Sequence, residues 1–183
     1  MLKKLCYVLS CSLFLWCCST FAIAKKITTL VPDSIEGPVT QAEIEKFNAY
    51  YPTYKVPESN DNKKMSWNLA PYIHALLFMY EITHDIQYIE QAIKAGDSVL
   101  KAKRTTDIDY VTQRIIPGWG YFNKQFTKKG GHPVLYNNVV GNATVMRSIT
   151  RLAVVIQENN LEDKYQLKAQ QYITSSIETI NDF

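Results

Sequence analysis

The chain has 183 residues, with 20 Lys and Arg against 17 Asp and Glu, and a formal net charge of +3. This small excess argues against a nucleic-acid-binding surface, which needs a clear basic excess. All four cysteines lie in the first 24 residues: Cys6, Cys11, Cys17 and Cys18. The other 159 residues are therefore expected to form no disulfide and no thiolate metal site.

Residues 1–24 are predicted to be a signal peptide. Lys3 and Lys4 form a positive start, an apolar run follows to Phe21, and Ala22-Ile23-Ala24 is the small-x-small pattern of a cleavage site. Cleavage after Ala24 predicts a secreted or periplasmic protein without stable membrane insertion. The alternative is a retained membrane anchor, because the run approaches the ~18 apolar residues that a span needs.

Residues 25–65 are predicted to form an N-terminal segment with one short helix. That helix opens with the capping box Thr40-x-x-Glu43 and runs to about Tyr50. The polar stretch 58–64 is expected to link it to a domain over residues 66–183.

A first helical hairpin is predicted from residue 68 to about residue 103. Residues 68–83 are apolar nearly all round, which indicates a helix buried on every side. After a tight turn with Asp85 as the N-cap, the next helix has one apolar face. Its other face carries Glu90 before Lys94 and Asp97 before Lys101, favourable pairs for a helix face in water.

The same pair of helices recurs over residues 138–158 and 162–180. Equivalent residues of the second helix in each pair are 77 positions apart: Tyr88 and Tyr165, Ala92 and Ala169, Leu100 and Ile177. Glu81 and Glu158 share this offset, so the two turns are predicted to have equal lengths. The pattern indicates an internal repeat of hairpins, each with a buried first helix and an exposed second helix.

The turn of the first hairpin carries a family resemblance. The stretch Tyr80-Glu-Ile-Thr-His-Asp-Ile-Gln-Tyr88 is similar to the "Tyr-Glu-x-Thr-x-Asp-x-x-Tyr" turn of the α/α-toroid, or six-hairpin glycosidase-like, superfamily. The resemblance covers about residues 66–180. It implies an all-α fold, with tandem antiparallel helical hairpins forming an arc of an (α/α)n toroid. It also implies a poly- or oligosaccharide partner, as for the glycoside hydrolases, polysaccharide lyases and uronyl epimerases of that superfamily.

A full toroid has about six hairpins, whereas this sequence supplies two. Two hairpins leave apolar flanks, and such surface is seldom left bare. The sequence is therefore expected to be a fragment of a longer gene product, to self-associate, or to bind a protein partner at the open arc. A non-catalytic helical scaffold or a truncated inactive fragment are the alternatives to a carbohydrate-processing protein.

The long loop 104–137 contains the aromatic stretch Arg114-Ile-Ile-Pro-Gly-Trp-Gly-Tyr-Phe122. Loops of this length are often functional. Trp119 and Tyr121, next to Gly118 and Gly120, suit a substrate-binding rim because flat aromatic faces stack on sugar rings. The alternative is that these aromatic residues fold back and cover the apolar flank of the hairpins.

Two sets of catalytic candidates follow. Asp107 and Asp109 are a candidate carboxylate pair for glycoside hydrolysis, or else they form surface ion pairs with Arg104 and Arg114. A lyase or epimerase instead needs a base and groups that stabilise negative charge.

For that second set, Tyr136 and His132 are candidate bases, and Asn138, Asn142 and Arg147 are candidate substrate-binding residues on one helix stripe. The alternative is that Asn138 caps its helix and Arg147 lies at the surface. The sequence does not decide whether the protein is an enzyme.

No metal and no cofactor are expected. His74, His84 and His132 lack the spacing of metal ligands, and His74 is expected to be a hydrogen-bonded core residue.

Overall fold

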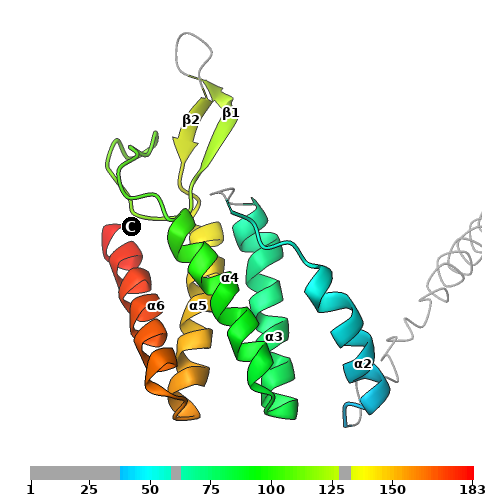
Figure 1. Cartoon of the computed structure of the whole chain (residues 1–183). Helices are drawn as coiled ribbons and strands as arrows, with labels where there is room; N and C mark the ends of the chain where they lie inside the picture. Colours follow the sequence, from blue (N-terminus) through cyan, green and yellow to red (C-terminus); the bar gives the residue numbers. More distant parts are fainter. Residues whose placement is uncertain (1–37, 59–62, 128–132) are drawn as a thin grey trace, which may run out of the picture. The chain divides into compact units, whose positions relative to one another are not determined.

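A computed structural model of the chain describes residues 38–58, 63–127 and 133–183 (Figure 1). All of them except Pro38 belong to one compact unit, Val39–Phe183. The expected signal peptide 1–24 and the candidate base His132 lie outside the described residues. Within them the fold is mostly α-helical, as the repeat predicts.

Helix α2 (Gln41–Tyr50) begins with the predicted capping box. The Thr40 hydroxyl accepts the backbone N–H of Glu43 at 3.3 Å, and a Glu43 carboxylate oxygen accepts the backbone N–H of Thr40 at 2.8 Å. Both bonds satisfy donors that a helix start leaves without partners. A short 3-10 helix, η1 (Tyr51–Thr53), follows.

The first hairpin starts with a π-helical stretch, η2 (Lys64–Leu69), which continues into α3 (Ala70–Thr83). His84 then adopts a left-handed conformation with φ 55° and ends α3. The Asp85 carboxylate accepts the backbone N–H of Gln87 at 3.0 Å and starts α4 (Ile86–Ala102). The predicted turn and N-cap are confirmed.

The second hairpin comprises α5 (Val139–Glu158) and α6 (Asp163–Asp182). The prediction of equal turns is wrong. Two residues, 84–85, separate the first pair of helices, but four, 159–162, separate the second. The longer turn contains Asn160, which has a φ of 48°. Asn160 is the second residue after α5, whereas His84 is the first residue after α3.

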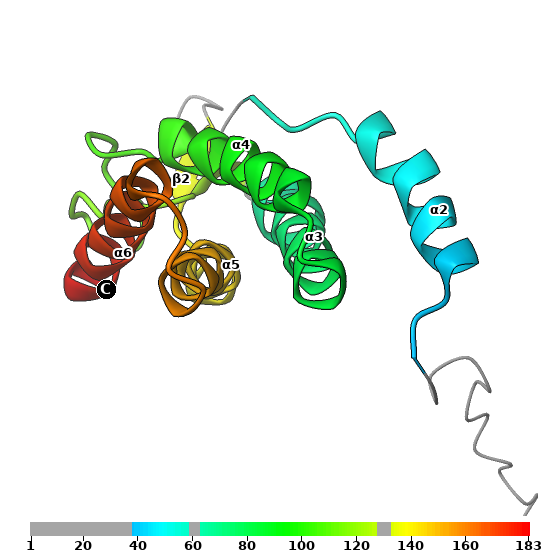
Figure 2. The ribbon, with the colours of Figure 1, turned by 60° about the horizontal axis from the view of Figure 1, so that its bottom comes forward.

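The helices form two layers. Helices α3 and α5 pack side by side, α4 packs on both of them, and α6 packs mainly on α5 (Figure 2). Buried side chains from all four helices fill the space between the layers, with Tyr88, Leu76, Ile149 and Tyr172 among the largest. Burial of this apolar surface is the main term that stabilises such a fold.

Burial differs from the sequence prediction at two helices. The first hairpin helix is not buried all round, because Phe78 is 58% exposed on the α3 face that lies beside α5. On α6, Ile177 and Ile180 belong to the predicted apolar face but are 52% and 59% exposed. The described part of the chain provides no third layer or neighbouring hairpin to cover them.

The polar face of α4 was predicted to pair its charges internally, and this is wrong. Glu90 instead accepts the hydroxyl of Tyr165 at 3.0 Å, and Asp97 binds Lys168 at 2.8 Å. These two acids therefore serve the contact between the hairpins.

Equivalent tyrosines make equivalent contacts along the repeat. The Tyr88 hydroxyl donates to the Asn48 side chain of α2 at 2.7 Å, just as the Tyr165 hydroxyl donates to Glu90 of α4. Helix α2 therefore accepts a tyrosine hydrogen bond from α4 in the same way as α4 accepts one from α6.

The loop 104–137 contains a two-stranded antiparallel sheet that the all-α prediction missed. Strand β1 (Tyr121–Thr127) pairs with β2 (Pro133–Tyr136), and Tyr121 lies opposite Tyr136. Isolated bridges join Arg104 to Gly118 and Ile108 to Ile115. The strands stand at the end of the bundle where α4 ends and α5 begins (Figure 1).

Among the described residues, α5 is the one helix that is long and apolar enough to cross a membrane. Half of its apolar stretch is buried in the bundle, and it contacts both α3 and α6. This is the pattern of a core helix in a helical domain.

Candidate functional site

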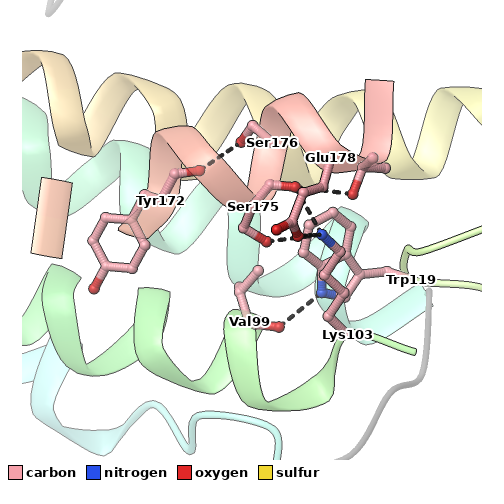
Figure 3. Close-up of polar contacts among 8 residues, drawn as sticks. Val99, Lys103, Trp119, Tyr172, Ser175, Ser176 and Glu178 are labelled. Carbon is pink, nitrogen blue, oxygen red and sulfur yellow. Dashed lines mark hydrogen bonds and ion pairs between the residues drawn. The ribbon is translucent and has the colours of Figure 1, made fainter. Parts of the chain in front are cut away.

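Trp119 is an internal anchor. Its side chain is fully buried, and its indole N–H donates to the Val99 carbonyl at 2.8 Å (Figure 3). Its backbone N–H donates to the Asn142 side chain at 2.7 Å. The prediction that Trp119 offers its ring to a sugar is wrong, because stacking needs an accessible face. The alternative, in which Trp119 folds back into the helices, is confirmed.

The Lys103 side chain packs against the ring of Trp119. Its ammonium group lies 5.9 Å from the centre of the Trp119 ring and donates to Ser175 at 2.8 Å and to Glu178 at 3.0 Å (Figure 3). The Lys103 side chain is only 6% exposed. The end of α4, the loop and the end of α6 are thus held together at one point.

The two glycines beside Trp119 allow a close approach of chains. A Cβ atom on Gly118 would lie 2.5 Å from the Asn142 side-chain oxygen, and one on Gly120 would lie 2.6 Å from that of Asn137. A side chain at either position would require the asparagine amide to move. The Gly-Trp-Gly pattern is therefore a packing signal, and it does not mark the exposed substrate-binding rim that was predicted there.

The other loop aromatics sit around the strands. Tyr121 and Tyr136 are half-buried and meet edge to face, with ring centres 5.7 Å apart. Phe122 is 51% exposed, and the Arg104 guanidinium lies 4.8 Å from its ring centre.

The carboxylate pair is not a catalytic pair. Asp107 forms a surface ion pair with Arg104 at 2.8 Å, which confirms that alternative for Asp107 but not for Asp109. Asp109 is 2% exposed and accepts the backbone N–H groups of Val111, Thr112 and Asn137 at 2.8–3.0 Å. Because this carboxylate is buried and accepts three backbone N–H groups, it organises the loop and is not accessible to a substrate.

The electrostatics of Asp109 agree with this role. Burial alone would raise the pKa of its carboxyl, but the bonds from Thr112, Asn137 and Val111 outweigh burial and the pKa is lowered. A glycosidase acid needs the opposite shift.

The predicted stripe of Asn138, Asn142 and Arg147 is divided between two tasks. Asn138 caps α5 by accepting the backbone N–H of Gly141 at 3.0 Å, as the alternative expected. Asn142 is fully buried, and besides its bond to Trp119 it donates to the Asn138 carbonyl at 2.9 Å. Only Arg147 faces outward, and it lies further along α5.

Arg147 lines a groove between α3 and α5 that is the strongest candidate site in the described structure. The groove has a volume of about 450 Å³. Its lining consists of aromatic, basic and acidic side chains from two packed helices: His74, Ala75, Leu77, Phe78, Glu81, Arg147 and Arg151. Residues on paired helices are held more firmly than residues on loops.

The two arginines of the groove differ in their partners. Arg151 forms an ion pair with Glu81 and lies 3.8 Å from Glu158, so one arginine bridges the two repeat-equivalent glutamates. Arg147 is exposed, and no carboxylate of the described residues pairs with it. Arg147 is therefore the cation available to an anionic ligand.

His74 stands between these charges in a half-buried position. Burial lowers the pKa of its imidazole, and the positive charges of Arg147 and Arg151 lower it further. The imidazole is thus neutral at pH 7, and a neutral imidazole can accept a hydrogen bond or a proton.

The sequence predicted Arg147 as a site residue, but not its neighbours His74 and Phe78. Both were assigned to the core because their helix is apolar all round. The spacing of four between His74 and Phe78, and again between Arg147 and Arg151, is the signal that places each pair on one helix face.

A second cavity, of about 580 Å³, lies between residues 52–58 and α4. Tyr54 and Tyr72 stack in its wall with ring centres 4.2 Å apart, and Lys94 and Lys101 stand on its α4 side. It lacks an imidazole or a guanidinium, and much of its wall is irregular chain. The groove between α3 and α5 has the richer chemistry.

Among the described residues, no group of His, Cys, Asp and Glu side chains is arranged to hold a metal ion. Comparisons of this chain with models of protein families, with curated proteins and with solved structures find no match.

Proposed function

We propose that this chain is an exported protein of helical hairpins, built as an arc of an α/α toroid, that binds acidic poly- or oligosaccharides. The proposed site is the groove between α3 and α5. The observation that supports it most directly is the exposed Arg147, without a carboxylate partner in the described chain, in the same groove as the exposed ring of Phe78.

The charge of the groove favours a carboxylated sugar over a neutral one. A guanidinium binds a carboxylate through two parallel N–H donors, which combines attraction with orientation. Arg151 is already neutralised by Glu81, so Arg147 is left to recognise the negative group of the ligand.

Phe78 supplies the second requirement for a sugar. An exposed aromatic face stacks on the C–H face of a pyranose ring. Because Phe78 and Arg147 line one groove, a single uronate residue is able to meet both, with its ring on Phe78 and its carboxylate on Arg147.

Processing of the glycan by β-elimination is a second candidate function, favoured by the neutral His74 next to Arg147. In that reaction the imidazole takes the proton beside the uronate carboxyl. The released electron pair forms a carbon–carbon double bond as the bond to the glycosidic oxygen breaks, and the departing oxygen takes a proton from water to become a hydroxyl. Arg147 stabilises the charge that builds on the carboxylate.

Affinity electrophoresis tests the binding proposal. The protein is run through gels that contain polygalacturonate, alginate or a neutral mannan. We expect retardation by an acidic polymer, and a loss of at least about tenfold in affinity for Arg147→Ala, the effect of removing a charge-assisted bond. Phe78→Ala should weaken binding to a similar degree.

Two matched variants control for general effects. Arg114→Ala removes an exposed arginine of the loop, and Phe122→Ala removes an aromatic ring of similar exposure. Both should bind as the unaltered protein does. Equal retardation by neutral mannan, or equal loss in the controls, contradicts the proposal. No retardation by any polymer favours the scaffold alternative.

The elimination reaction has a separate test. Release of unsaturated uronate from a panel of acidic polymers should occur with the unaltered protein and be lost in His74→Gln, while that variant still binds. If the protein binds but releases no unsaturated uronate, binding is the whole function.

A further inference from the structure

The cavity of about 580 Å³ beside α4 has two walls. One wall is the chain that follows η1, residues 52–58, which we call the strap, and the other is a face of α4. We call the space between them the strap cavity. It shares no lining residue with the groove between α3 and α5, so a ligand here would meet a separate set of side chains.

Hydrogen bonds fix the strap at both ends. At its start, the Tyr72 hydroxyl donates to the Tyr51 carbonyl at 3.3 Å, and the Tyr51 hydroxyl donates to the Gln87 side chain at 3.2 Å. At its other end, the Ser98 hydroxyl of α4 donates to the Pro57 carbonyl. The strap cavity is therefore bounded by a segment that is attached to the helices on either side of it.

The α4 wall carries two lysines without the partners that their spacing predicts. The acids four positions before them, Glu90 and Asp97, are both engaged by side chains of α6. Neither Lys94 nor Lys101 forms an ion pair with a carboxylate of the described residues. Both are exposed, and their spacing of seven places them on one face of α4, about 10 Å apart along the helix axis.

The charges that line the strap cavity favour an anion. Lys55 of the strap joins the two lysines of α4, and the acids of the lining are Glu58 and Asp97. Asp97 is neutralised by Lys168, which is not part of the lining. The lining therefore has an excess of ammonium groups, which bind acidic groups as compact point charges.

Tyr54 and Tyr72 give the strap cavity an aromatic wall. Their rings stack with centres 4.2 Å apart. The Tyr54 hydroxyl is buried and has no hydrogen-bond partner among the described residues. Because a buried hydroxyl without a partner costs free energy, this wall would gain from a ligand that supplies an acceptor.

We propose that the strap cavity binds a small organic anion, with a ring on the tyrosine wall and an acidic group at Lys94 and Lys101. The ring belongs to a sugar or to an aromatic acid, because both kinds of ring pack on tyrosine. The volume suits such a ligand, since small-molecule sites measure roughly 300–1,000 Å³. This site is independent of the proposed glycan groove, and each stands if the other fails.

Isothermal titration calorimetry tests the proposal in the Arg147→Ala background, in which the groove between α3 and α5 lacks its unpaired guanidinium. Phenyl phosphate and glucose 6-phosphate carry an aromatic ring and a sugar ring on the same acidic group. Inorganic phosphate lacks a ring, and glucose lacks a charge. At least one ring-bearing phosphate should bind at least about tenfold more tightly than inorganic phosphate or glucose. The one that binds more tightly identifies the ring.

Two double variants locate the binding. Lys94→Gln/Lys101→Gln should weaken it at least about tenfold, because both ammonium groups are removed. Lys46→Gln/Lys164→Gln removes two exposed helical lysines outside the strap cavity and should bind as the background protein does. No binding of either ring-bearing phosphate, equally tight binding of inorganic phosphate, or equal binding by the two double variants overturns the proposal.

A last comparison separates this site from the glycan groove. With Arg147 present, Lys94→Gln/Lys101→Gln should leave retardation by acidic polymers unchanged. Loss of the small anion with retardation intact supports two separate sites. Loss of both in this variant overturns the independence of the strap cavity.

Discussion

The indole N–H of Trp119 donates to the backbone carbonyl of Val99 at 2.8 Å, across the junction between the long loop and α4. The partner carbonyl belongs to a fully buried residue in the last turn of α4. This one bond therefore ties the sheet-bearing loop to the first hairpin.

Replacement of Trp119 should act on stability. Trp119→Phe leaves the Val99 carbonyl without its donor and should lower the free energy of unfolding by about 1–3 kcal/mol. Trp119→Ala also leaves a large cavity and should cost about 3–5 kcal/mol. Urea titration followed by circular dichroism measures both, and Trp67→Phe, at an exposed tryptophan, should change stability by less than about 0.5 kcal/mol.

Asp109 should give the protein an acid-sensitive loop. Because its folded-state pKa is lowered, the stability it contributes is fully present above its ordinary pKa of about 3.9 and is lost as pH falls through the lower folded value. Asp109→Asn should remove this part of the pH dependence. It should also cost about 1–3 kcal/mol at pH 7, because a neutral amide is a weaker acceptor for three backbone donors.

The measurement is the urea midpoint of both proteins between pH 7 and pH 2. Asp107→Asn is the control, since its carboxylate is a surface partner of Arg104. An Asp109→Asn protein with the same midpoint and the same acid dependence as the unaltered chain would show that the loop does not depend on this carboxylate.

Gly96 should be intolerant of even one methyl group. A Cβ atom there would lie 2.8 Å from the tip of the Tyr172 ring, whose hydroxyl is held by the Ile93 carbonyl at 3.1 Å and by Asp97 at 3.0 Å. Gly96→Ala should destabilise by about 1–3 kcal/mol, although alanine favours a helix by about 1 kcal/mol.

A double variant separates the clash from other effects. In the background of Tyr172→Leu, which lacks the ring, Gly96→Ala should become neutral or stabilising. If the cost of Gly96→Ala is the same in both backgrounds, contact with Tyr172 is not its cause.

His74 should make stability fall in mild acid. Its folded-state pKa is lowered, first by burial and then by Arg147 and Arg151, so the unfolded chain binds the proton more tightly. Stability should therefore rise with pH up to the ordinary imidazole value of about 6.5 and be lost as pH falls below it. Glu81, the acid of the same groove, is paired with Arg151.

Nuclear magnetic resonance titration of the imidazole measures the His74 pKa directly, and His74→Gln should flatten stability between pH 7 and pH 5. Arg147→Ala should raise the pKa of His74 toward its ordinary value. A His74 that titrates at or above 6.5 in the unaltered protein would contradict the assigned environment.

The local features of the fold were predictable because short-range patterns encode them. The capping box of Thr40 and Glu43 and the N-cap at Asp85 rest on residues within a few positions of one another. Each helix of the repeat is likewise encoded by the apolar period within it. The strands at Tyr121 and Tyr136 were missed because their pairing depends on a contact across a loop, and no alternating pattern announces it.

The groove was harder to predict for a similar reason. Phe78 lies on a helix that is apolar all round, so its sequence does not say which apolar residue faces outward. That choice depends on where α5 sits. Asn142 shows the converse, since a polar residue on an expected site stripe is fully buried by its bond to Trp119.

The attachment of the long loop to both hairpins through Trp119 affects the cooperativity of unfolding. Trp119 is hydrogen-bonded to α4 through Val99 and to α5 through Asn142. Unfolding of either hairpin therefore breaks a contact of the residue that also anchors the other hairpin. Repeat proteins often melt in stages because each unit touches only its neighbours through a modest interface. This shared anchor should merge the two hairpins into a single cooperative transition, with calorimetric and van't Hoff enthalpies that agree.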